Sequence, residues 1–143
     1  MPDILHDFPI QAPAAAVFAA VTSAAGLDQW WTLRAAGEPR VGATYELFFG
    51  PEYDWRARVS RCTPNTEFEL EMTRADTDWL GTKVGFRLEQ DGKVTKVQFW
   101  HRGWQDPNAH YRTSNCCWAM YLRILRRHVE HGEVVEYDRR LDV

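Results

Sequence analysis

The sequence has few of the features that mark secreted, membrane or nucleic-acid-binding proteins. Only 3 of its 143 residues are cysteine, an odd number that gives no disulfide framework. No apolar run approaches the ~20 residues that a membrane-spanning helix needs, and His6, Asp7 and Pro9 break the N-terminal apolar stretch, which excludes a signal peptide. The formal net charge of −3 lacks the basic excess that binds nucleic acids or anionic membranes. We therefore expect a cytoplasmic protein without nucleic-acid or membrane partners.

Signatures of common catalytic centres are also missing. The chain has no glycine-rich phosphate loop, no Ser/His/Asp signature and no CxxC pair. His128 and His131 lie near the end of a predicted helix, but a zinc site needs a third or fourth ligand that nothing supplies. The adjacent Cys116 and Cys117 favour buried thiols over a metal site or a disulfide. We expect neither a metal nor a cofactor.

Aromatic residues, in contrast, are abundant: they make up 13% of the chain and include 7 tryptophans. Such rings either fill a core or line a cavity. The length suits one domain, which we place at residues 1–132. The remaining residues, 133–143, form a charged C-terminal tail that we expect to fray.

Alternating apolar and polar residues predict most of the domain as short strands. The first is expected over residues 4–10, where Ile4, His6, Phe8 and Ile10 share one face. Pro13 begins a short helix and Ser23 caps a second one. Further strands are predicted over residues 44–49, 53–62, 66–73, 80–90 and 93–104.

Two turns predict the register of neighbouring strands. A type I′ turn at Asp91-Gly92 pairs Phe86 with Val97, Val84 with Phe99 and Thr82 with His101. A hairpin at Pro64-Asn65 pairs Val59 with Leu70, Ala57 with Met72 and Arg58 with Glu71. In both hairpins apolar residues then meet on one face, so the alternation and the turns agree.

The chain ends in its only long predicted helix, over residues 113–130. Its apolar face consists of Trp118, Tyr121, Leu122, Leu125 and Val129, and Gly132 follows as the C-terminal cap. A curved antiparallel sheet must bury its apolar face against another layer, and this helix is the long candidate. The order of elements therefore predicts an α+β fold with the sheet wrapped around a long C-terminal helix and two short helices after the first strand.

Several segments resemble the helix-grip superfamily, also called SRPBCC, START-like or Bet v 1-like. The chain is most similar to the branch that contains the C-terminal domain of the activator of Hsp90 ATPase. In this sequence Cys117 replaces the glycine that usually precedes the helix tryptophan. The resemblance implies a helix-grip fold but no shared catalytic signature. The residues that carry it are Ile10–Phe18, Leu27–Trp31, Val41-Gly42, Thr95–Trp104, Trp118–Leu125 and Glu130–Gly132.

A cavity between such a sheet and its helix is a common ligand site, so we predict that the inward residues bind a ligand. Small or polar side chains among the rings leave room for one. The predicted lining consists of Tyr45, Leu47, Trp55, Ala57, Leu70, Met72, Thr82, Val84, Phe86, Phe99, His101, Cys117, Trp118 and Tyr121.

Two of the remaining features have alternative interpretations. His101 is either a core histidine bonded to Thr82 or a catalytic base in the cavity. Glu67, Glu69 and Glu71 form either a solvated strand face or an acidic cation site. Their alternation with apolar residues favours the solvated face.

Three functions are consistent with these features. The first is the binding of a small hydrophobic or aromatic molecule by a monomer or homodimer. The second is a cyclase- or hydratase-like enzyme that uses His101 as its base, and the third is a chaperone-interacting protein. For the third, Trp100 faces outward by parity and is the predicted centre of an exposed interaction patch.

Overall fold

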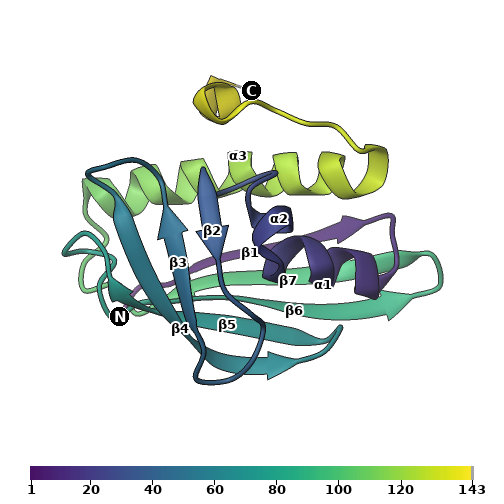
Figure 1. Ribbon diagram of the computed structural model, residues 1–143, viewed down its shortest axis with the longest axis horizontal. Coiled ribbons are helices and arrows are strands. Elements are labelled where there is room, and N and C mark those ends of the chain that lie inside the picture. The colour runs from purple at the N-terminus through teal and green to yellow at the C-terminus, as the bar shows by residue number, and fades with distance from the viewer. Residues whose placement is uncertain (143) are drawn as a thin grey trace.

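The chain forms one antiparallel sheet that packs against one long helix, which confirms the predicted α+β class (Figure 1). The computed structural model describes residues 1–142. Figure 1 shows α3 along one side of the curved sheet and the C-terminal segment turning back along α3. The elements are β1 (Ile4–Ile10), α1 (Ala14–Thr22), α2 (Ala24–Leu27), β2 (Arg34–Ala36), β3 (Thr44–Phe48), β4 (Asp54–Thr63), β5 (Glu67–Arg74), β6 (Lys83–Asp91), β7 (Val94–Arg102), α3 (Ala109–His131) and the 3₁₀ helix η1 (Tyr137–Asp142).

The strands follow the order β1-β7-β6-β5-β4-β3-β2, so the first strand of the sequence lies beside the last. The short strand β2 was not predicted, because three residues are too few to show alternation. The two short helices are confirmed: Pro13 precedes α1, and the Ser23 hydroxyl accepts a bond from the Gly26 N–H at 2.9 Å.

The register predicted for the β6–β7 hairpin is wrong by two residues. Phe86 pairs with Phe99 and Val84 with His101, because Gly92 and Lys93 rather than Asp91 and Gly92 form the turn. Gly92 has a φ of 64° at the first turn position, as a type II′ turn requires. A shift of two residues keeps every side chain on its predicted face, so the inward set is unchanged.

The β4–β5 hairpin contains two compensating irregularities. Its connection is one residue longer than predicted, since Thr63 pairs with Glu67. An irregularity between Val59 and Arg61 then restores the predicted pairing of Val59 with Leu70. The predicted pairs farther from the turn are therefore confirmed.

Helix α3 begins earlier than predicted and ends as predicted. The Asn108 side chain accepts a bond from the Tyr111 N–H at 2.9 Å, and Gly132 ends the helix with a left-handed φ of 69°. Trp118, Leu122 and Leu125 are buried against the sheet. None of the described helices is long and apolar enough to cross a membrane.

The C-terminal tail packs onto the domain rather than fraying. Its anchor is Arg140, which is 5% exposed and donates to the carbonyl oxygens of Asp28, Thr32 and Val135 at 2.5, 3.1 and 3.1 Å. These charge-assisted bonds hold η1 against the segment that follows α2. Val143, the last residue of the predicted tail, lies outside the described residues.

Candidate functional site

The chain contains a cavity of about 410 Å³ between the sheet, the first half of α3 and the C-terminal segment. It reaches the surface, because Tyr53, Asp76 and Leu141 at its wall are exposed. The lining side chains come from elements far apart in the sequence. They are Trp31, Phe49, Tyr53, Trp55, Asp76, Trp79, His110, Thr113, Ser114, Cys117, Trp118, Tyr121, Tyr137 and Leu141.

Eight of these 14 lining residues are aromatic, and the rings of seven of them, all except Tyr137, contact one another in a continuous cluster. Trp79 lies at the centre, with ring centroids 4.9 Å from Trp55 and 5.8 Å from Trp118. Trp118 in turn lies 5.2 Å from Trp31. The mutual packing of these rings gives the cavity a preformed apolar wall.

The polar groups of the wall are few, and most are already paired. Ser114 accepts a bond from Trp79 Nε1 at 3.3 Å, and His110 Nδ1 lies 3.0 Å from the Asp78 carboxylate. Burial raises the pKa of the Tyr121 hydroxyl to about 12 and also raises the pKa of the Cys117 thiol. Both groups are therefore neutral at pH 7, because their burial disfavours the charged form of each.

Four of the 14 predicted lining residues, Trp55, Cys117, Trp118 and Tyr121, lie at this cavity. The rest lie in the packed core, each at most 4% exposed, and do not line it. Neighbouring side chains fill the space beside them, which the alternation of inward residues alone does not reveal. These core residues are Tyr45, Leu47, Ala57, Leu70, Met72, Thr82, Val84, Phe86, Phe99 and His101.

The lining residues that sequence analysis missed lie mainly outside regular strands. Trp79 enters from the turn before β6, Tyr137 from η1 and Trp31 from the loop after α2. Phe49 and Tyr53 did carry a signal: Phe49 continues the inward alternation of Tyr45 and Leu47, and Tyr53 that of Trp55 and Ala57.

His101 is fully buried, and both of its ring nitrogens are bonded. Its Nδ1 accepts a bond from Trp118 Nε1 at 3.0 Å, and its Nε2 lies 2.8 Å from Thr82 Oγ1. Burial, with a smaller contribution from His110, lowers the pKa of His101 to about 3. The ring has neither a free nitrogen nor access to the cavity in this conformation, so it is not positioned for proton transfer.

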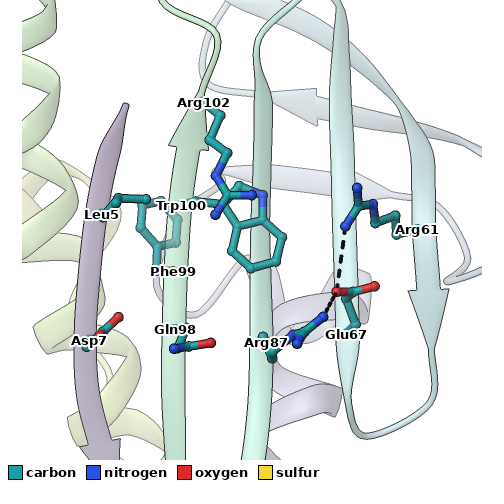
Figure 2. Close-up of a pocket in the computed structure, with 9 residues that line it drawn as sticks. All are labelled: Leu5, Asp7, Arg61, Glu67, Arg87, Gln98, Phe99, Trp100 and Arg102. Atoms are coloured by element: carbon teal, nitrogen blue, oxygen red, sulfur yellow. Dashed lines mark hydrogen bonds and ion pairs between the residues drawn. The ribbon is translucent and has the colours of Figure 1, made fainter. Parts of the chain in front are cut away.

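The outer face of the sheet carries a second hollow, of about 570 Å³, around Trp100 (Figure 2). Trp100 faces outward as predicted, but it is only 4% exposed and therefore does not form the predicted exposed patch. Its ring covers Gly85 on the neighbouring strand, and the Arg102 guanidinium lies 4.7 Å from its centroid. This close fit needs a residue without a Cβ at position 85.

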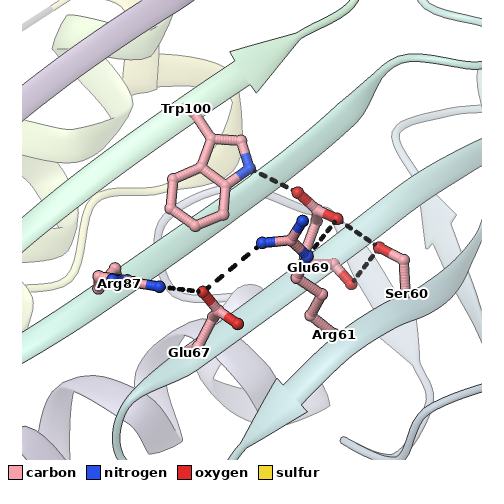
Figure 3. Close-up of polar contacts among 6 residues, drawn as sticks. All are labelled: Ser60, Arg61, Glu67, Glu69, Arg87 and Trp100. Atoms are coloured by element: carbon pink, nitrogen blue, oxygen red, sulfur yellow. Dashed lines mark hydrogen bonds and ion pairs between the residues drawn. The ribbon is translucent and has the colours of Figure 1, made fainter.

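The three alternating glutamates are each paired with other side chains, and Figure 3 shows the contacts of Glu67 and Glu69. Glu67 contacts Arg87 at 3.0 Å, whereas Glu69 is buried and accepts bonds from Trp100 Nε1 and Ser60 Oγ, both at 2.8 Å. Glu71 pairs with Arg58 at 3.0 Å. Within residues 1–142 no group of three His, Cys, Asp or Glu side chains could hold a metal ion.

Comparisons with known proteins relate the whole fold to solved structures. The Aha1 dimer from Colwellia psychrerythraea has 28% sequence identity and a TM-score of 0.83, covering 93% of this chain and 99% of that one. CalU16 from Micromonospora echinospora (18% identity, TM-score 0.76, 98% and 81% coverage) and MLL2253 from Mesorhizobium loti (15%, 0.78, 93% and 100%) share the fold.

No curated protein matches the chain. The family described as activator of Hsp90 ATPase homolog 1-like protein matches residues 11–130, which include both short helices and nearly all of α3. The chain therefore belongs to this family, within the SRPBCC or Bet v 1-like superfamily.

Proposed function

We propose that this protein binds a small apolar or aromatic molecule in the cavity beside α3. The supporting observation is the wall of eight aromatic rings around about 410 Å³ of space that reaches the surface. Small-molecule sites are concave, mostly apolar and roughly 300–1,000 Å³ in volume. The protein acts in the cytoplasm as a monomer or a homodimer in this proposal, and the relative from Colwellia psychrerythraea is a dimer.

The hydrophobic effect supplies most of the affinity in this proposal. Each Å² of apolar ligand surface removed from water contributes ~25 cal/mol. The rings already pack against one another, so little side-chain entropy is lost when a ligand enters. The bonded His101 gives no support to a catalytic role, and we assign no reaction to the cavity.

Titration with N-phenyl-1-naphthylamine, a neutral dye that fluoresces in apolar surroundings, tests the proposal. We expect one saturable site on the native protein and displacement of the dye by naphthalene. Cys117→Phe places a ring in the cavity and should weaken dye binding at least tenfold, because Cys117 lies at the wall.

Cys116→Phe is the matched control, since Cys116 is exposed on the same helix and does not line the cavity. It should leave the dissociation constant within about twofold. Equal dye binding by both variants, or binding that appears only during unfolding, would show that the cavity is not the site.

A chaperone-interacting function is the second candidate, favoured by the family match and by the likeness to Aha1. Its test is whether the purified chain binds Hsp90 and stimulates its ATPase. Lack of both effects at micromolar concentrations would argue against it.

A further inference from the structure

We propose that the ligand of the aromatic cavity is an organic cation, with an ammonium or similar group attached to an apolar or aromatic body. This inference rests on the proposed function and adds the sign of the ligand's charge. Two features of the wall support it: the charges at the cavity, and the chemistry of its rings.

The lining residues include one carboxylate, Asp76, and neither lysine nor arginine. Asp76 is exposed at the wall. Within residues 1–142 its carboxylate makes no ion pair or hydrogen bond, and only its backbone carbonyl oxygen accepts hydrogen bonds. His110 is the one lining side chain that can carry a positive charge, and its Nδ1 already lies 3.0 Å from the Asp78 carboxylate. The mouth therefore has a carboxylate free to meet a cation and no basic side chain free to meet an anion.

Arg140 is the nearest buried positive charge, behind the wall rather than in it. Its guanidinium lies 5.4 Å from the centroid of the Tyr137 ring, and its three nitrogens donate to backbone carbonyls. These carbonyl dipoles oppose its field only in part, because its charge still acts at the wall, against the burial that raises the pKa of the Tyr121 hydroxyl. The contact also shows that a ring of this wall packs against a cation within the folded chain.

Four of the eight lining rings are tryptophans, whose indole faces attract cations more strongly than other aromatic side chains. Recognition of quaternary ammonium groups by clustered aromatic rings is a known use of this attraction. Burial disfavours a ligand charge of either sign. The unpaired Asp76 carboxylate and the aromatic rings therefore determine that a positive charge is preferred over a negative one. An anionic ligand would gain nothing from either.

Three naphthalene derivatives of similar size and different charge test the inference. They are trimethyl(1-naphthylmethyl)ammonium, 1-naphthalenemethanol and 1-naphthaleneacetate, each titrated calorimetrically at pH 7 and in competition with the neutral dye. We expect the cation to bind at least tenfold more tightly than the acid, with the alcohol between them. The ammonium charge is fixed, so protonation of the ligand does not affect the comparison.

Asp76→Asn should weaken binding of the cation about three- to tenfold and leave the alcohol unchanged. Asp106→Asn is the control, because Asp106 is exposed, does not line the cavity and changes the net charge equally. Equal or tighter binding of the acid, or equal effects of the two variants on the cation, would overturn the inference. If none of the three displaces the dye and Cys117→Phe has no effect on dye binding, the proposed function itself fails.

Discussion

The hydrogen bonds of His101 determine its tautomer. The Trp118 indole nitrogen can only donate, so His101 Nδ1 must carry a lone pair and Nε2 the proton. Nε2 then donates to Thr82 Oγ1, whose own proton goes to the carbonyl oxygen of Trp79 at 2.5 Å. A second proton on His101 would set two donors against each other at Nδ1, so these bonds and burial both keep the ring neutral.

This neutral ring predicts that the protein loses stability in mild acid. The pKa of His101 is about 3 in the folded chain and 6.5 when unperturbed, so the unfolded chain binds the extra proton between these values. The contribution to stability is therefore complete above pH 6.5 and is lost as the pH falls, at up to ~1.4 kcal/mol per pH unit. Urea denaturation at pH 7, 6 and 5 measures this slope.

His101→Gln is the comparison for that experiment, because its side chain does not titrate. The variant should show a shallower dependence of stability on pH over the same range. An NMR titration in which the His101 ring of the native protein titrates near pH 6.5 would contradict the assignment of a buried neutral ring.

At the scale of elements, the β6–β7 hairpin shows what alternation can and cannot predict. Alternation predicted correctly that His101 faces inward beside Thr82, although the two residues are not cross-strand partners. Alternation has a period of two, so it fixes a face but not a register. The identity of the turn residues did not resolve the register either, because glycine suits more than one turn position.

The cavity was less predictable than the sheet for a related reason. Trp79, Tyr137 and Leu141 reach it from a turn and from the C-terminal segment, where no periodic pattern indicates a direction. Only tertiary contacts, such as the bond from the Tyr137 hydroxyl to the Phe49 carbonyl oxygen at 3.1 Å, place them. A single sequence could therefore predict α3 and the strands, but only part of the site.

On the outer face of β6 and β7, Gly85 and the Trp100 ring pack so closely that one added methyl group should destabilise the protein. A Cβ at Gly85 would lie 2.5 Å from atoms of the Trp100 ring. Gly85→Ala should therefore displace the ring, break its bond to Glu69 and destabilise the protein by ~1–3 kcal/mol in urea denaturation. In a Trp100→Leu background the same change should cost less. Equal costs in both backgrounds would mean that the clash is not the cause.

The docked C-terminal segment predicts different roles for two adjacent arginines. Arg140→Ala removes all three of its bonds to carbonyls and should destabilise the segment by ~1–3 kcal/mol, which increases amide hydrogen exchange in residues 133–142. Arg139→Ala should change exchange little, because Arg139 is exposed and its side chain makes no bond within the described residues. Equal protection in the two variants would contradict the anchoring role of Arg140.

At the scale of the whole molecule, the core and the cavity share the same rings. Trp31, Trp79 and Trp118 line the cavity, yet each is at most 7% exposed. The sheet, α3 and the C-terminal segment thus meet in one aromatic cluster that is both packed interior and binding wall. Substitutions that remove these rings will change folding and binding together, which is why Cys117 and Asp76 are better probes of the site.

Trp118 is the residue at which this coupling should be greatest. It is 1% exposed, and its ring contacts Trp31 in the loop after α2 and Phe99 in β7. Its indole nitrogen also donates a hydrogen bond to His101. Trp118→Ala should therefore destabilise the protein by ~3–5 kcal/mol in urea denaturation. Arg123→Ala, on the exposed face of the same helix, should cost less than ~0.5 kcal/mol. A loss below ~1 kcal/mol for Trp118→Ala would mean that the helix does not hold the two layers together through this ring.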